Sequence, residues 1–173
     1  AETKNKLFVT ATAEKGAYTA ASKTDTLALL DEKNYYRTAC YPHKLAATEY
    51  VDAGVMARCF AIDPGGETWA LKSLGGITAD GWSETEFNAI VKKNGNTFEK
   101  VRNVTVTQNG KVAAGEWIDV IRFRDWLQEE MATNIFTTLK NANKIDYTDA
   151  GIAIIEGQIR KTLQYGQDKH GIS

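Results

Sequence analysis

Few side chains in this 173-residue sequence have a type and spacing that catalysis or metal binding requires. The two histidines, His43 and His170, lie far apart, so no i, i+4 pair exists to hold a metal ion, and a hydrogen-bonded or solvated histidine is the favoured interpretation. The two cysteines, Cys40 and Cys59, form no CxxC motif and fall in apolar segments, which predicts buried free thiols in a reducing cytoplasm. We therefore predict no bound metal, no cofactor and no disulfide.

Nucleophilic and phosphate-binding motifs are also missing from the sequence. Ser73 and Ser83 lie outside any Gly-x-Ser-x-Gly elbow, and the glycines at positions 65 and 66 lack the following Lys-Ser or Lys-Thr of a nucleotide-binding loop. The adjacent carboxylates Glu129 and Glu130 point in different directions on a helix, which is poor geometry for general acid and base catalysis. These patterns predict a protein that is not an enzyme, with no catalytic, cofactor-binding or metal-binding residue.

The overall composition excludes several other classes of function. With 21 basic and 22 acidic side chains the net charge is −1, which gives no general attraction to nucleic acid or to acidic lipid. No apolar run approaches the roughly 20 residues that a membrane-spanning helix needs. Tryptophan can stack on a base or a sugar, but no basic groove accompanies the four tryptophans, so we expect them to belong mostly to the core. They are Trp69, Trp82, Trp117 and Trp126.

The N-terminal third of the sequence is typical of an α/β crossover. A strand is expected over residues 6–13, a short helix capped by Thr24 or Asp25 and running to Leu30, and a second strand over residues 35–41 that stops at Pro42. Apolar residues at helical steps then predict a helix over residues 46–62, which the Asp-Pro-Gly-Gly sequence at 63–66 terminates. Residues 69–74 read as a possible further strand.

The middle of the chain predicts one more helix and several strands. Ser83 is a good helix cap, and Asn94-Gly95 is expected to close that helix as its C-cap. Residues 97–101 and 104–107 read as strands, and Asn109-Gly110 predicts a hairpin turn leading into residues 111–113. The expected fold class is α/β, with a mixed β-sheet flanked by helices. The residues expected on the buried side of the helix are Phe87, Ile90 and Val91.

Residues 115–163 carry the strongest periodicity and predict a C-terminal amphipathic helical hairpin. A polar break at 141–147 separates two helices, and Thr148 is placed to cap the second, with Asp149 in its first turn. Each helix must bury its apolar stripe against another element. The first stripe is Val120, Phe123, Leu127, Met131, Ile135 and Leu139; the second is Ile152, Ile155, Ile159 and Leu163.

Charged residues near the start of the first of these helices allow two interpretations. Asp119 and Asp125 flank Arg122 and Arg124, so they can form exposed ion pairs within the helix or charged contacts to a neighbouring subunit. The first interpretation is the favoured one, and each such pair is worth at most about 1 kcal/mol.

Several irregular motifs in the sequence resemble the sheath proteins of contractile bacteriophage tails, of the myovirus type. They follow in order as Pro-Gly-Gly-Glu-Thr-Trp at 64–69, Leu-Lys-Ser-Leu-Gly-Gly-Ile at 71–77, Asn-Gly-Asn-Thr-Phe at 94–98, Gly-Glu-Trp-Ile-Asp at 115–119, Asp-Trp-Leu at 125–127, and Lys-Ile-Asp-Tyr-Thr-Asp-Ala-Gly-Ile at 144–152. The resemblance spans residues 64–171. Members of the family usually have proline where Asp146 stands, which affects the expected conformation of that turn.

The resemblance implies a structural subunit whose complete form surrounds a tail tube and contracts to drive the tube through the host envelope. It implies other sheath subunits, tube proteins and baseplate proteins as partners, a place in the virion tail, and assembly in the bacterial cytoplasm. We expect residues 1–173 to be one core module with a possible boundary near residue 115, without the terminal arms, and monomeric when isolated. The alternatives are another tail component, such as a baseplate or tube protein, and a small α/β ligand-binding module or enzyme.

Overall fold

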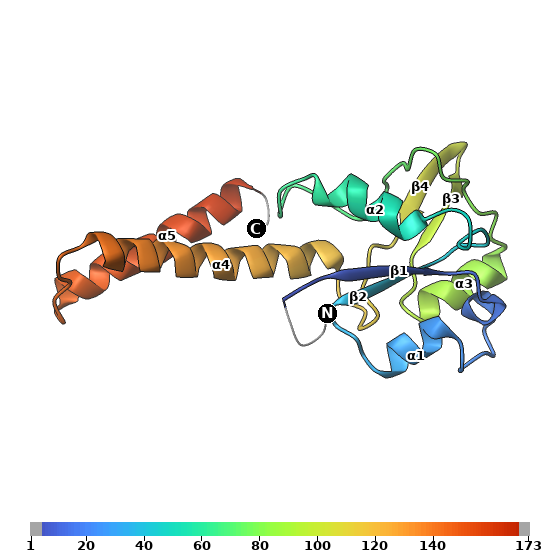
Figure 1. Ribbon diagram of the computed structural model, residues 1–173, viewed down its shortest axis with the longest axis horizontal. Coiled ribbons are helices and arrows are strands. Elements are labelled where there is room, and N and C mark those ends of the chain that lie inside the picture. The colour runs from blue at the N-terminus through green and yellow to red at the C-terminus, as the bar shows by residue number, and fades with distance from the viewer. Residues whose placement is uncertain (1–4, 170–173) are drawn as a thin grey trace. The chain divides into compact units, whose positions relative to one another are not determined.

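A computed structural model describes residues 5–169 and divides the chain into two compact units (Figure 1). The first unit contains the described residues up to Asp63 together with Glu67–Ile121. The second contains Pro64–Gly66 and the described residues from Arg122 onward. Parallel and antiparallel strand pairs combine with five α-helices in the described chain, which confirms the predicted α/β class. The predicted boundary near residue 115 stays a prediction.

The first unit begins with the predicted β-α-β crossover. Strand β1 (Phe8–Thr12) leads through a 3₁₀ turn, η1 (Lys15–Tyr18), and helix α1 (Thr26–Glu32) to strand β2 (Thr38–Pro42), which pairs parallel to β1. Asp25 caps α1 by accepting a hydrogen bond from the Ala28 amide. The second strand starts three residues later than predicted. It ends at Pro42, so the missing amide hydrogen of that proline removes no hydrogen bond from the middle of the strand pair.

The sheet of β1 and β2 has hydrophobic cores on both faces. Along β2, Ala39 and Tyr41 join a core with Val9, while Cys40 points to a second core. This alternation follows from the two-residue period of a strand. The first core also contains Val51, Val55, Cys59, Trp69, Leu74, Phe98, Val112, Ile118 and Ile121; the second contains Ala17, Leu27 and Ile90.

Helix α2 (Val51–Phe60) covers the first core, but the prediction that it begins at residue 46 was wrong. Residues before Val51 form turns instead, in which the amides of Ala46 and Thr48 bond to the carbonyls of His43 and Leu45. The apolar positions Val51, Val55 and Cys59 are buried at helical spacing, so the periodicity identified the helix but not its first residue.

Helix α3 (Glu84–Lys92) has the predicted ends. Ser83 and Glu86 form a reciprocal capping box, and Asn94 adopts a positive φ of 55° just beyond the last turn. The amides of Asn94 and Gly95 bond to the carbonyls of Val91 and Ile90, which is the hydrogen-bond pattern of a Schellman motif. The Val91 side chain is exposed, contrary to prediction, because the buried face of the helix runs through Ala89 and Ile90.

A buried ion pair that the sequence reasoning missed ties α3 to the N-terminal segment. The Lys93 ammonium donates to the Asp25 carboxylate at 2.8 Å and to the carbonyls of Gly16 and Thr19 at 2.9 and 3.1 Å. Burial alone would raise the pKa of Asp25, but the hydrogen bonds from Lys93 and from the Ala28 amide outweigh it and lower that pKa. The pair therefore fixes the start of α1 against the end of α3.

The two expected strands, β3 (Thr97–Val101) and β4 (Val104–Gln108), form an antiparallel pair. The turn between them is Arg102-Asn103, where both residues have positive φ, so the prediction of a hairpin at Asn109-Gly110 was wrong. At that position the Asn96 side chain accepts the amides of Gly110 and Lys111, which turns the chain away from β4.

Two short segments that were predicted as strands are irregular. Residues 69–74 run beside β4 and exchange hydrogen bonds with Thr107, but Leu71 has a φ of 59°, which interrupts the extended conformation. Residues 111–113 contribute only an isolated bridge between Lys111 and Trp117. The strands of the described chain consequently form two separate two-stranded sheets instead of one continuous mixed sheet.

The second unit is the predicted helical hairpin. Helix α4 (Ile118–Asn141) begins in the first unit and continues into the second, and helix α5 (Asp149–Asp168) follows after a short loop. Thr148 caps α5 as expected by accepting the Gly151 amide. None of the helices within residues 5–169 combines the length and the apolar character that crossing a bilayer requires.

Candidate assembly surface

His43, the histidine that the structure describes, belongs to a buried polar cluster in the first unit. Its Nδ1 lies 2.7 Å from the Asp80 carboxylate, and its Nε2 lies 3.5 Å from the Glu49 carboxylate. Hydrogen bonds from the amide and hydroxyl of Thr78 lower the pKa of Glu49. Within residues 5–169 no group of three or more His, Cys, Asp or Glu side chains is arranged to hold a metal ion. His43 thus joins the end of β2 to two loops; His170 lies outside the described residues.

The cysteines and serines have structural roles. Cys40 and Cys59 are buried free thiols, as predicted, and burial raises the pKa of Cys40 to about 12, which suppresses the reactive thiolate at neutral pH. The Ser73 hydroxyl donates to the Thr105 carbonyl, and Ser83 caps α3. In these described hydrogen bonds, neither Ser73 nor Ser83 is paired with a histidine that could activate it as a nucleophile.

The Pro-Gly-Gly turn at residues 64–66 packs within the second unit. Gly65 has a φ of 94°, and a Cβ built on it would lie 3.1 Å from the Phe123 ring and 3.3 Å from the Lys169 carbonyl. A side chain at this position would be strained by both the backbone conformation and the close neighbours. The turn thus permits close packing beside the helical hairpin, as expected of a structural turn.

The charged residues at the start of α4 include one exposed ion pair and one carboxyl group with a raised pKa. Arg124 Nη2 lies 3.7 Å from the Asp125 carboxylate, with half of the Arg124 side chain exposed, so this pair contributes little stability. Burial raises the pKa of Asp119, the nearby Glu116 acts in the same direction, and the hydrogen bond from the Val120 amide opposes them. Both earlier interpretations, pairing within the helix and contact to a neighbouring subunit, remain predictions for these residues.

The tryptophans divide between the core and the surface. Trp69 is buried and packs edge-on against Phe60, and Trp82 is half-buried beside Tyr18. Trp117 is 45% exposed, with the Lys111 ammonium 4.9 Å above its ring, so the expectation of a core position was wrong for this residue.

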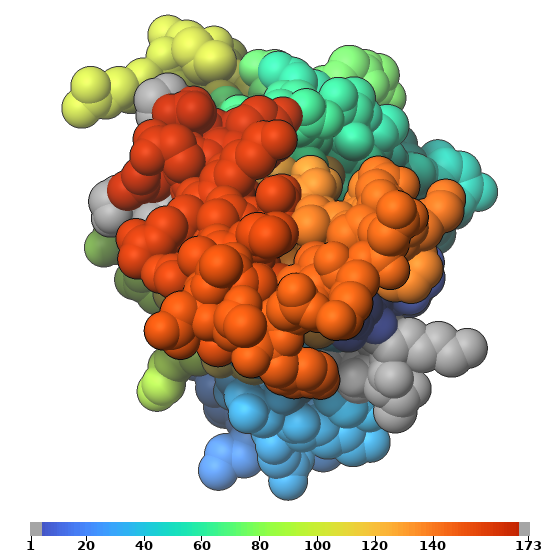
Figure 2. All heavy atoms as spheres, turned by 90° about the vertical axis from the view of Figure 1, so that its left-hand side faces the viewer, coloured from blue at the N-terminus to red at the C-terminus, as the bar shows by residue number. Residues whose placement is uncertain are grey.

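The two helices of the hairpin are held together by a polar contact and an aromatic one. Asn134 on α4 donates to the Thr162 hydroxyl on α5 at 3.0 Å, and the ring centroids of Trp126 and Tyr165 lie 5.6 Å apart. Figure 2 shows α4 in orange beside α5 in red. Sequence reasoning missed this polar contact, although a polar residue at Asn134 and another at Thr162 interrupt otherwise apolar helix faces. Those interruptions were the available signal.

The turn between the helices is shaped around a small residue. Gly151 is buried in the first turn of α5, and a Cβ built there would lie 2.0 Å from the Asp146 carbonyl oxygen. Asp146, which stands where the family usually has proline, makes an exposed 2.6 Å ion pair with Lys144. The loop therefore closes tightly onto α5 with aspartate in place of proline.

The burial of the two predicted stripes differs from expectation. Val120 and Leu139 are 50% and 47% exposed, and the buried residues at the start of α4 are Ile118, Ile121 and Phe123. On α5 the buried positions are Gly151, Thr162 and Gly166, of which Gly151 lies against the loop at Asp146 and Thr162 faces Asn134 of α4.

The hairpin consequently leaves many large apolar side chains exposed. Their exposed fractions range from 38% for Leu163 to complete exposure for Tyr147. Single exposed apolar residues are common on protein surfaces, but this many on one pair of helices is not. Such an exposed apolar set is typical of a surface that contacts other molecules. It comprises Phe136, Leu139, Tyr147, Ile152, Ile154, Leu163 and Tyr165.

Comparison with known proteins connects this hairpin to a protein family. Residues 118–172 match the family model described as E217 tail sheath protein gp31-like, C-terminal domain. No curated protein matches the sequence. The match begins at the first residue of α4 and includes all of α5, whereas the motifs at 64–98 lie outside it and that part of the resemblance stays a prediction. Residues 118–172 are therefore similar to a domain of phage tail sheath proteins, which confirms the resemblance for the part of the chain that contains the helical hairpin.

Proposed function

We propose that this chain is a structural part of a contractile phage tail sheath, which surrounds the tail tube and contracts to drive the tube through the host envelope. The observation that carries the proposal is the match of residues 118–172 to a tail sheath domain, because it covers the helical hairpin whose apolar surface is exposed. A subunit of a helical lattice needs such surfaces to contact its neighbours.

Contraction in this proposal is a change of packing and not a chemical reaction. An extended lattice is metastable, and the contracted lattice is favoured by the summed difference in subunit contacts over many copies. Neighbours stay linked by strand exchange through terminal arms while each folded unit moves as a rigid body. Within each unit, contacts such as the buried ion pair of Lys93 with Asp25 and the partly buried hydrogen bond of Asn134 with Thr162 support such rigidity.

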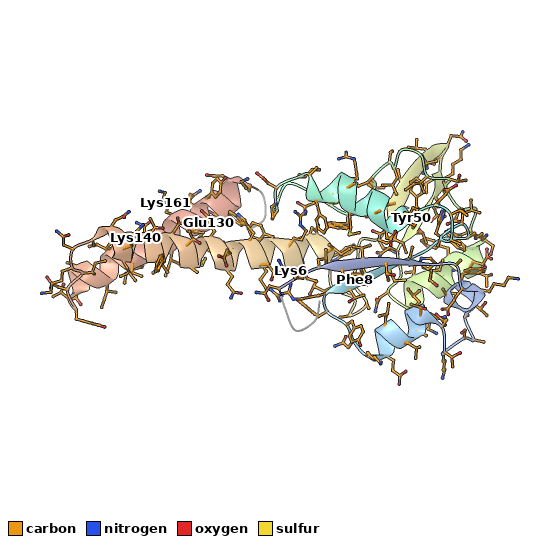
Figure 3. All side chains as sticks on the ribbon, viewed as in Figure 1. Lys6, Phe8, Tyr50, Glu130, Lys140 and Lys161 are labelled. Carbon is orange, nitrogen blue, oxygen red and sulfur yellow. The ribbon has the colours of Figure 1, made fainter. Side chains whose placement is uncertain are left out.

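The proposed partners are other sheath subunits, tube proteins and baseplate proteins, in a virion tail assembled in the bacterial cytoplasm. No catalysis and no cofactor are required. In the first unit, Phe8 on β1 and Tyr50 before α2 are 52% and 69% exposed and are candidates for contacts with such partners (Figure 3). Exposed aromatic residues are favoured at protein interfaces because they bury much area at little entropic cost.

Negative-stain electron microscopy of the gene product, expressed alone, tests the proposal. Hollow helical tubes that are wide enough to enclose a tail tube are the expected result. A narrow smooth-bore tube would indicate a tube protein instead, and a lattice of a different symmetry would indicate a baseplate component. Dispersed particles, together with stabilisation by a nucleotide, sugar or metal in a thermal screen, would indicate a ligand-binding module or an enzyme.

A further inference from the structure

Leu71 combines a strained backbone with an exposed apolar side chain. Its φ of 59° lies in the left-handed region, which is unfavourable for a residue with a bulky side chain. Among residues 5–169, the other non-glycine residues with a positive φ are asparagines, which tolerate it, and Arg102 in the turn between β3 and β4. The Leu71 side chain is 74% exposed, so burial within the described chain does not compensate for the strain.

Hydrogen bonds on both sides of Leu71 hold this conformation. The Leu71 amide donates to the Thr107 carbonyl at 2.7 Å, and the Lys72 amide donates to the Thr107 hydroxyl at 3.0 Å. The amide and hydroxyl of Thr107 donate in turn to the carbonyls of Lys72 and Trp69, at 2.9 and 2.8 Å. Trp69 is buried in the first core, so the turn is fixed to the interior of the first unit. Leu71 is thus held in place before any partner binds, which reduces the entropy lost on binding.

We propose that Leu71 is an anchor that inserts into an apolar pocket of a neighbouring sheath subunit. The proposal deepens the proposed function and rests on it, since it names one contact between sheath subunits. Strained residues cluster at functional sites, where the surrounding structure maintains a conformation that is locally unfavourable. A side chain that enters a pocket makes a heterologous contact, in which two different surfaces meet, and repeated heterologous contacts generate helical assemblies.

The charge beside Leu71 indicates the chemistry of the pocket. Within residues 5–169 the Lys72 ammonium has no ion pair or hydrogen bond, although the Lys72 backbone is held by Thr107. The nearby hydroxyls of Thr68 and Ser73 donate to the carbonyls of Ala70 and Thr105. The anchor therefore presents one unpaired positive charge next to an apolar side chain. An acidic group at the rim of the pocket would complement that charge.

The critical concentration at which the complete gene product forms tubes, measured by pelleting, tests this inference. Leu71→Asn removes the apolar side chain but suits a positive φ. We expect the critical concentration to rise at least about tenfold, because burial of a leucine side chain changes a dissociation constant by at least that factor. The Tm of the 173-residue chain should stay unchanged or rise by about 2 to 4 °C, because the substitution relieves strain.

Leu45→Asn is the matched control. Leu45 lies in a turn of the same unit, is 43% exposed and has no positive φ, so its substitution should leave the critical concentration unchanged. Lys72→Glu tests the rim of the pocket: it should raise the critical concentration, because it places a negative charge against the acidic group. An unchanged or lower value for this variant would contradict an acidic rim.

Three results would overturn the inference. One is an unchanged critical concentration for Leu71→Asn, and another is an equal rise for Leu71→Asn and Leu45→Asn. The third is a fall in Tm of more than about 4 °C for Leu71→Asn, which would show that the leucine is needed for folding. Failure here is distinguishable from failure of the sheath proposal, because tubes formed by the unchanged gene product would uphold the sheath function. The absence of such tubes would count against both.

Discussion

Removing the ammonium of Lys93 is the most informative perturbation of the first unit. Lys93→Met keeps the length of the side chain but deletes the hydrogen bonds to Gly16, Thr19 and Asp25. The side chains of Lys93 and Asp25 are only 10% and 2% exposed, so water cannot readily replace the lost partner. The Asp25 carboxylate would remain buried, with the Ala28 amide still bonded to it.

The expected loss of stability is about 3 kcal/mol. Breaking a buried ion pair by removing one partner typically costs about 3 to 5 kcal/mol, and the remaining bond from Ala28 favours the lower value. Protonation of Asp25 sets an upper limit on the loss of stability. Protonating an aspartate with an ordinary pKa of about 3.9 at pH 7 costs about 4 kcal/mol, so the unpaired buried charge cannot cost more than that. Asparagine is also a good helix cap, so Asp25→Asn combined with Lys93→Met should recover part of the loss.

Urea unfolding followed by tryptophan fluorescence measures this effect. A Trp126→Phe background removes the tryptophan of the second unit, so the signal reports on the first. Lys92→Met is the control, because Lys92 is the exposed neighbour and its loss should cost at most about 1 kcal/mol through the helix dipole. A loss below about 1 kcal/mol for Lys93→Met, or strict additivity with Asp25→Asn, would refute the reasoning.

Two further predictions concern Asp25 and the glycines of α5. Because the pKa of Asp25 is lowered in the folded chain, its contribution to stability should be complete above about pH 4 and should be lost as the pH falls below that value. Asp25→Asn should reduce this sensitivity to acid, which urea midpoints measured over a range of pH would show. Gly151→Ala should destabilise α5 by more than about 2 kcal/mol, because its Cβ would overlap the Asp146 carbonyl. Gly157→Ala, with nothing within 4 Å, should stabilise it by about 0.5 to 1 kcal/mol in thermal unfolding, and the same sign for both would contradict the packing argument.

Features decided by local chemistry could be predicted from the sequence. Asp25, Ser83 and Thr148 cap the helices that they were expected to cap, because each places a side-chain oxygen before a helical run. The parallel crossover also followed from the order of a strand, a helix and a strand. These features depend on residues that are near one another in the sequence, so a single sequence contains the information that specifies them.

Features decided by distant side chains could not be predicted in this way. Asn109-Gly110 has the composition of a hairpin turn, but Asn96 takes the amides of Gly110 and Lys111 and redirects the chain. Residues 69–74 have the composition of a strand, but Leu71 adopts a positive φ while bonded to Thr107. In both places a tertiary hydrogen bond to a residue far along the chain outweighs the local preference.

The helical hairpin shows how a correct periodicity can assign the wrong burial. The stripe through Ile152 and Leu163 has the spacing of a core face, yet both side chains are exposed and α5 turns Thr162 toward Asn134 of α4. A hairpin of two helices needs only one contact line between them, so a stripe wider than that line must be covered by something else or remain exposed. The surplus of apolar residues, which includes Ile152 and Ile154, is therefore evidence about assembly, because an exposed apolar set of this size is typical of a surface that contacts other molecules.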